Sequence, residues 1–350
     1  MIDFKIEKLE EMIEESIPKI KENEGNFCIS TSIPHNWSIE EEEYWDLDLE
    51  YECIKGRINK IVVEKIKKET GKGYMAENAN FRIKYDLKNE SYFITREPLF
   101  IFGRYEKYSG GISQTRWVCR NCSGKGCREC KESGKNYLSI EEVMGEEFKK
   151  EFKCKNYFLH ASGREDVDVC NLAGRPFVLE LVEPEKLNVN LEKIRENILK
   201  TGIIAVRNLK IVPRGFVEIV SNSHFDKIYL AEVETNSKIS QTDIKKVLKE
   251  LDGRIIFQKT PNRVIHRRAN LTRKRKILDL KIGKIRETGF EIEIKTEPGT
   301  YIKELIHGDL ERTKPSIAKI LGMDAECKKL IVSKIEDEFL ESIDQPELKI

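Results

Sequence analysis

Four cysteines within twelve residues constrain this chain more than any other feature of its sequence. They are spaced C-x2-C-x4-C-x2-C, at Cys119, Cys122, Cys127 and Cys130. Gly124 and Gly126 lie between the two pairs and would let the backbone turn tightly enough for four thiolates to converge on one tetrahedral ion. Because four sulfur ligands leave no open coordination position, we predict a structural zinc rather than a catalytic one. The alternative is a reduced, metal-free loop. The other five of the nine cysteines are scattered, and we expect buried or incidental thiols there.

Charge is strongly segregated, although the net charge is only +1. Residues 39–52 carry eight acidic residues and no base, whereas residues 254–276 carry nine lysines and arginines and no acid. One concentrated basic block suits a protein that grips a polyanion with one face. The alternative is a solvated surface loop, which is what most isolated charge runs are.

Length and hydropathy indicate the number of domains and whether the chain crosses a membrane. A chain of 350 residues favours two domains. No apolar run approaches the ~18 residues that a membrane span needs, and the first segment lacks the apolar centre of a signal peptide. We therefore expect no membrane partner and a cytoplasmic location.

The first hundred residues have the pattern of a small α+β domain. Apolar residues recur at helical spacing in segments 6–20 and 54–66, and the second segment is followed by Gly71 and Gly73 as stop signals. Strands are predicted at 26–33, 81–85 and 92–95.

The remainder predicts a loop or metal knuckle followed by a second α+β region. Residues 103–135 are rich in glycine and cysteine and lack apolar periodicity. Helices are predicted at 194–200 and 244–251, the latter with Thr242 as its cap. Strands are predicted at 177–182, 203–206, 216–220 and 290–294.

The second chemical signal is the string A-S-G-R-E-D-V-D-V at 161–169, followed by G-R-P-F-V-L-E at 174–180. It predicts a glycine-introduced turn that exposes Asp166 or Asp168 at a strand end, beside Arg164 and Arg175. A carboxylate next to guanidinium groups stays ionised, as a nucleophile must. A structural ion pair in a turn is the alternative.

These strings, in this order, resemble the archaeal-type tRNA pseudouridine synthases that act on positions 54 and 55 of tRNA. The resemblance extends over nearly the whole chain. Further matching strings are F-C-I-S-T-S-I-P at 27–34, G-R-Y at 103–105, Q-T-R-W at 114–117, the cysteine knuckle, H-R-R-A at 266–269 and G-T-Y-I-K at 299–303 with H-G-D at 307–309. The sequence departs from the family pattern at Cys170 and Leu230, where the family usually has arginine.

The resemblance implies a role for individual residues. Asp166, the last residue of G-R-E-D, would be the nucleophile, and Asp168 would support it. Tyr229 would pack against the target base, Tyr301 would contact the substrate, and Lys303 would pair with the catalytic carboxylate. In the mechanism that the family implies, the uridine leaves the stack before attack, and Arg164 would join Lys303 in keeping Asp166 charged. No catalytic cofactor is implied.

The basic block would then bind tRNA phosphates in the T-arm. The contacts are assigned to Arg263, Arg267, Arg268, Arg273, Lys274 and Arg275. Residues 1–102 would form a THUMP-type RNA-binding domain that recognises tRNA shape, residues 103–137 a linker with the knuckle, and residues 138–345 a catalytic domain with a mixed, largely antiparallel sheet. We expect a monomer.

Two other functions fit parts of the pattern. A non-catalytic zinc protein that binds RNA would use the same knuckle and basic block. A methyltransferase or thiouridine synthetase would need a G-x-G-x-x-G turn or a phosphate-binding loop, and the sequence contains neither.

Overall fold

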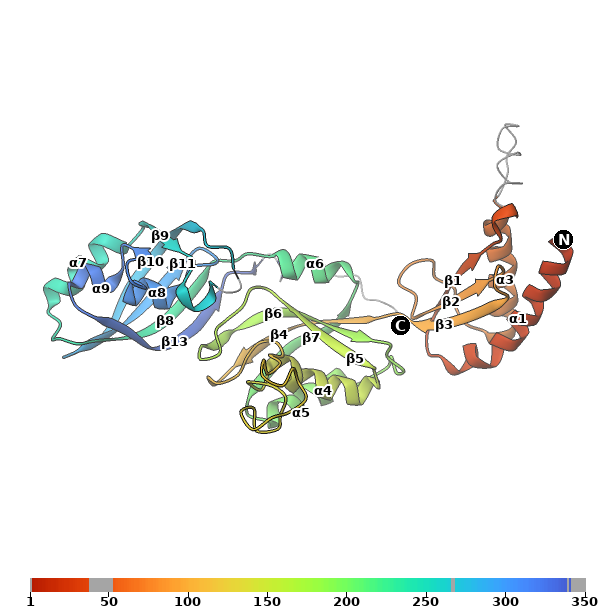
Figure 1. The fold of residues 1–350 in the computed structure, drawn as a ribbon, viewed down its shortest axis with the longest axis horizontal. Helices are drawn as coiled ribbons and strands as arrows, with labels where there is room; N and C mark the ends of the chain where they lie inside the picture. The colour runs from red at the N-terminus through yellow and green to blue at the C-terminus, as the bar shows by residue number, and fades with distance from the viewer. Residues whose placement is uncertain (1, 38–52, 266–267, 339, 341–350) are drawn as a thin grey trace, which may run out of the picture.

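The computed structural model describes residues 2–37, 53–265, 268–338 and 340, and the acidic run at 39–52 lies outside them. Within these residues the chain is an α+β protein with one small and one large sheet, arranged along an elongated molecule (Figure 1). The predicted fold class, with a mixed and largely antiparallel large sheet, is confirmed. No described helix combines the length and apolarity needed to cross a bilayer.

The N-terminal unit packs two helices on a three-stranded sheet at one end of the molecule (Figure 1). Its elements are α1 (Ile2–Glu22), β1 (Phe27–Ser32), α3 (Ile54–Thr70), β2 (Phe81–Asp86) and β3 (Ser91–Arg96). β1 and β2 pair in parallel, and β2 and β3 pair antiparallel. α3 ends where Gly71 adopts a left-handed φ of 70°, as its sequence predicts.

The large sheet has ten strands, and two large apolar cores and a smaller one pack on it. Along it the strand order is β12-β9-β10-β11-β8-β13-β6-β4-β7, with β5 paired to β6. Its strands are β4 (Leu99–Lys107), β5 (Asn156–Ala161), β6 (Cys170–Val182), β7 (Ile204–Val212), β8 (Lys227–Thr235), β9 (Ile255–Lys259), β10 (Thr272–Arg286), β11 (Gly289–Thr296), β12 (Thr313–Lys314) and β13 (Ala325–Ile335).

Helices cover this sheet in two groups (Figure 1). α4 (Ile140–Phe152) and α5 (Leu191–Lys200) pack on the half formed by β4 to β7. α7 (Gln241–Leu251), α8 (Ile302–His307) and α9 (Ile317–Leu321) pack on the half formed by β8 to β13. The halves meet where β13 pairs in parallel with β6, at Ile331↔Cys170 and Val332↔Asn171.

Three local predictions were wrong. Residues 216–220 form part of a helix, α6 (Gly215–Asn222), because Phe216 and Val220 lie one turn apart and are buried together; a short apolar run does not distinguish that from a strand. The cap of α7 is Ser240, not Thr242: its hydroxyl accepts from Asp243 N at 3.2 Å in a capping box. Residues 103–107 continue strand β4 and are not loop.

A buried ion pair fixes β4 to the C-terminal end of the large sheet. Arg104 Nη1 lies 2.5 Å from Asp337 Oδ2, and the two side chains are 2% and 5% exposed. Arg104 also donates to Gly174 O at 3.2 Å. Because both charges are removed from water, their contact offsets part of the cost of burying them.

We predict that Asp337→Ala lowers the free energy of unfolding by about 3–5 kcal/mol, because it removes one member of a buried ion pair. Denaturant unfolding measures this. Glu287→Ala is the matched control, since it breaks an ion pair with Lys238 whose side chains are 80% and 68% exposed, and we expect a change of at most about 1 kcal/mol. Equal effects of the two substitutions would contradict the role of the buried pair.

Candidate active site

Asp166 lies in the turn at 162–169, which links β5 to β6. The turn begins with Gly163 at a φ of +75°, a conformation that glycine adopts without strain. The Asp166 carboxylate is 29% exposed and faces a pocket of about 250 Å³. That volume is near the lower end of the ~300–1,000 Å³ typical of small-molecule sites and suits a single base.

Buried polar contacts from Arg175 and Tyr105 hold this turn in place on its protein-facing side. Arg175 Nε lies 2.5 Å from Glu165 Oε2, and both side chains are at most 2% exposed. Arg175 also donates to Ser162 O at 2.7 Å. Tyr105 OH donates to Glu165 Oε1 at 2.7 Å, and burial, with the Glu165 charge, raises the pKa of Tyr105 well above its usual value.

The expected surroundings of Asp166 are therefore only partly observed. Arg175 is not an exposed neighbour of Asp166, because it pairs with Glu165 on the buried side of the turn. Arg164 lines the pocket, but its Nη2 donates to Thr115 Oγ1 at 2.7 Å.

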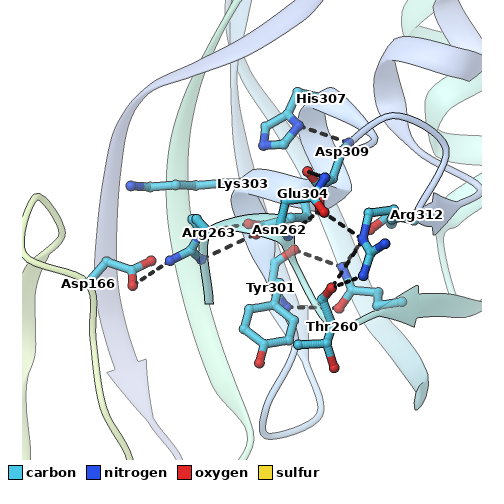
Figure 2. Close-up of polar contacts among 12 residues, drawn as sticks. Asp166, Thr260, Asn262, Arg263, Tyr301, Lys303, Glu304, His307, Asp309 and Arg312 are labelled. Atoms are coloured by element: carbon cyan, nitrogen blue, oxygen red, sulfur yellow. Dashed lines mark hydrogen bonds and ion pairs between the residues drawn. The ribbon is translucent and has the colours of Figure 1, made fainter. Parts of the chain in front are cut away.

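Among the described residues, Arg263 is the cation that contacts the carboxylate of Asp166. Its Nη1 lies 2.7 Å from Asp166 Oδ1, and its Nε lies 2.6 Å from Glu304 Oε1 (Figure 2). Glu304 is 2% exposed, so its charge depends on this arginine. One guanidinium thus bridges a buried acid on α8 and the exposed carboxylate of the turn.

Lys303 differs from its expected role. It lines the pocket, but its ammonium pairs with Asp168 rather than with Asp166. Although burial opposes the effect, the hydrogen bond and charge of Lys303 lower the pKa of Asp168. The basic partner of Asp166 is Arg263, which the sequence analysis had assigned to phosphate binding.

Both predicted tyrosines line the same pocket. Tyr229 lies on β8, and burial raises its pKa to about 12, so its phenol stays neutral. Tyr301 directly precedes α8, and the Arg263 guanidinium lies 5.9 Å from its ring centroid. The Tyr301 hydroxyl is buried and makes no hydrogen bond within the described part of the chain, which leaves it available to a bound molecule.

The basic block does not form one continuous face. Arg263 and Arg268 line the pocket, and Arg267 lies outside the described residues. On β10, Arg273 donates to Thr260 Oγ1 at 2.9 Å and Arg275 to Lys274 O at 2.8 Å. Lys274 lies over the Phe257 ring instead, since alternate residues of a strand face opposite sides.

The loop that carries Arg263 is anchored at its base. Asn262 N donates to Asp309 Oδ2 at 3.1 Å, and Arg312 Nε donates to Thr260 O at 3.1 Å (Figure 2). Arg312 Nη2 also reaches Asn270 Oδ1, on the far side of the loop, at 3.0 Å. The segment after α8 therefore sets the position of the loop over the pocket.

Sequence reasoning missed several of these residues. Glu304 could have been flagged because it lies between the apolar residues Ile302 and Leu305 on a short helix that buries both. Lys227 also lines the pocket; burial and the nearby Arg175 charge lower its pKa to about 8. No local pattern in the sequence distinguishes Lys227 from an exposed lysine.

The four cysteines converge as their spacing predicts. Their sulfur atoms all lie within 4.8 Å of one another, with Cys119–Cys127 at 3.9 Å and Cys122–Cys130 at 3.8 Å. Zn–S bonds of ~2.3 Å in a tetrahedron place sulfurs ~3.8 Å apart. Three backbone N–H groups, of Gly126, Cys127 and Gly134, point at Cys122 or Cys130 sulfurs, which favours thiolates. The donor set fits one metal ion.

Comparisons with known proteins decide the family. A family model described as "Pus10, C-terminal" matches residues 100–336. The tRNA pseudouridine synthase Pus10 of Methanocaldococcus jannaschii is 40% identical over 346 residues, which cover 95% of this chain and 74% of that protein. The protein of the same name from Archaeoglobus fulgidus is 37% identical, with 93% and 91% covered.

The chain belongs to the Pus10 family of tRNA pseudouridine synthases. Pseudouridine synthases are isomerases, and the resemblance stated from the sequence is confirmed. Among solved structures, a Cbf5–Nop10–Gar1 complex is 18% identical with a TM-score of 0.37, covering 67% of this chain and 50% of that one.

We predict about one equivalent of bound divalent metal per chain, because the four thiolates form one closed tetrahedral set. Cys122→Ser should lose most of the metal and lower the melting temperature, since metal binding to such a site contributes folding free energy. Elemental analysis and thermal unfolding measure both effects. Cys53→Ser is the control, because Cys53 is exposed and caps α3, a task that serine also performs. A metal-free wild type, or equal metal in both variants, would contradict the site.

Proposed function

We propose that this chain isomerises uridine 54, uridine 55 or both in the T-loop of tRNA to pseudouridine, with Asp166 as the nucleophile. One observation carries the proposal: in a member of the Pus10 family, the partly exposed carboxylate of Asp166 faces a base-sized pocket and is held by Arg263 at 2.7 Å. An ion pair with a guanidinium holds a carboxylate in one orientation.

The reaction exchanges one bond for another within the same nucleotide. The bond between C1′ of the ribose and N1 of uracil breaks, the ring turns, and C5 forms a new bond to C1′. The proton on C5 is lost, and N1 ends protonated, so the reaction needs no redox or group-transfer cofactor. Asp166 would attack the flipped-out nucleotide, which must leave the stack for the carboxylate to reach it.

The pocket residues would keep the detached uracil in place while it turns. Tyr229 supplies a neutral aromatic wall, since its pKa of about 12 keeps the phenol protonated. The buried Tyr301 hydroxyl would hydrogen-bond the nucleotide. Lys303 would fix Asp168 at the rim of the same turn, and Arg164 would contact the flipped nucleotide from the edge of the pocket.

Binding of the tRNA T-arm would begin at the basic loop above the pocket. Arg268 lines the pocket, and Arg267, Arg273 and Arg275 would add phosphate contacts, so affinity should fall steeply with salt. Residues 1–102 would form a THUMP-type domain that binds the tRNA by shape. The protein would act as a monomer.

A structural zinc would brace the linker at 103–137, ahead of the catalytic domain at 138–345. Two hydrogen bonds join this linker to the edge of the pocket: Arg164 Nη2 donates to Thr115 Oγ1 at 2.7 Å, and Gln114 Nε2 donates to Gly163 O at 3.0 Å. Zinc suits four thiolates in tetrahedral geometry better than the other common divalent metals.

Unmodified tRNA transcripts, incubated with the wild type and Asp166→Ala side by side, test the proposal. We predict pseudouridine formation by the wild type and none by Asp166→Ala, because removing a nucleophile removes the covalent route. The Kd for tRNA should stay within about twofold, since Asp166 is not a phosphate contact. Transcripts with cytidine at position 54 or 55 assign the site.

Asp279→Ala is a matched control, because it removes a surface carboxylate on β10 that pairs with exposed Lys281. Binding without modification by the wild type would leave a zinc-containing RNA-binding protein in place of the enzyme. Modification by Asp166→Ala would reject Asp166 as the nucleophile.

A further inference from the structure

Lys107, the last residue of β4, is completely buried, with 0% of its side chain exposed. Lysine is almost never fully buried without partners, because its ammonium loses its hydration. Here the ammonium donates to three backbone carbonyls: Ile112 O at 2.7 Å, Val167 O at 2.8 Å and Asp166 O at 3.2 Å. All three of its donors are thus used.

Two of the three acceptors belong to the turn at 162–169, and one of these is the carbonyl of Asp166 itself. No ion pair joins Lys107 to a carboxylate in the described part of the chain, so the direct contacts of the ammonium are with backbone carbonyls, while the nearby charge of Glu165 also favours the charged form. Burial lowers the pKa of Lys107, which means that the fold holds this ammonium at a cost. A methionine of similar length would fill the same space without that cost.

Other contacts hold the beginning of the same turn. Gln114 Nε2 donates to Gly163 O at 3.0 Å, and Arg175 Nη1 donates to Ser162 O at 2.7 Å. At the other end, Gly111 N donates to Val167 O at 3.0 Å, alongside Lys107. Only Lys107 and Val169 N, at 3.2 Å, contact the backbone carbonyl of Asp166 among the described residues.

We propose that Lys107 is a positioning residue for pseudouridine formation: its buried ammonium fixes the backbone of Asp166 so that the carboxylate points into the pocket. This inference rests on the proposed role of Asp166 as the nucleophile. Lys107 does not touch the substrate, so it acts through the geometry of the turn. A misplacement of about 1 Å at a reacting group can lower a rate by about 100-fold.

Single-turnover rates at saturating tRNA, expressed per folded molecule, test the proposal in Lys107→Met and Lys107→Gln. We expect Lys107→Met to lower the rate by about 10- to 100-fold, with the Kd for tRNA within about twofold. Lys107→Gln keeps an amide donor, so it should recover part of the loss and give an intermediate rate.

Ile198→Ala separates positioning from stability. Ile198 lies on α5 and is buried in the apolar core that also contains residues of β4, so this variant should lower the melting temperature and keep the rate per folded molecule. If Lys107→Met does not fold, Lys107→Gln decides alone. A rate per folded molecule within about twofold of wild type in the Lys107 variants would overturn the proposal.

Asp166→Ala in the same assay tests the proposed function separately from the role of Lys107. Activity retained by Asp166→Ala would reject the proposed function and with it the inference. An inactive Asp166→Ala, together with Lys107 variants that keep the wild-type rate, would reject the role of Lys107 alone.

Discussion

The site exists because β13 pairs in parallel with β6 over only two residue pairs, and this short contact joins the halves of the ten-stranded sheet. Each half has its own apolar core. The first residue of β6 in that pairing is Cys170, directly after the turn that carries Asp166. Asp166, in the turn just before this junction, therefore faces Arg263, which the other half of the sheet supplies.

Charge links the two halves across this junction. Glu304 is buried on one side, Asp166 is partly exposed on the other, and Arg263 lies between them at 2.6 and 2.7 Å (Figure 2). A buried carboxylate without a partner would be costly, so Glu304 holds Arg263 in place even when the pocket contains no substrate. Arg263 is therefore already in place beside Asp166 before RNA binds, so the site is preorganised.

The sequence predicted local features well where one residue type has one physical reason to be present. The cysteine spacing predicted a cluster whose sulfurs do converge, and Gly71 marked a helix end. The segment at 216–220 was misassigned because its helix is set by burial against β4 and β6, not by its own pattern. Asp166 pairs with Arg263 and not with Lys303, which pairs with Asp168. This choice depends on how the two halves of the large sheet meet, and the spacing of residues along the chain does not predict it.

The central claim is that Glu304 holds Arg263 in place, and that Arg263 in turn holds the carboxylate of Asp166 in one orientation. Glu304→Gln tests it most directly, because the amide keeps the size of the side chain and removes only its charge. The account predicts a single-turnover rate of pseudouridine formation about tenfold or more below wild type, with an unchanged Kd for tRNA. A wild-type rate in Glu304→Gln would contradict it.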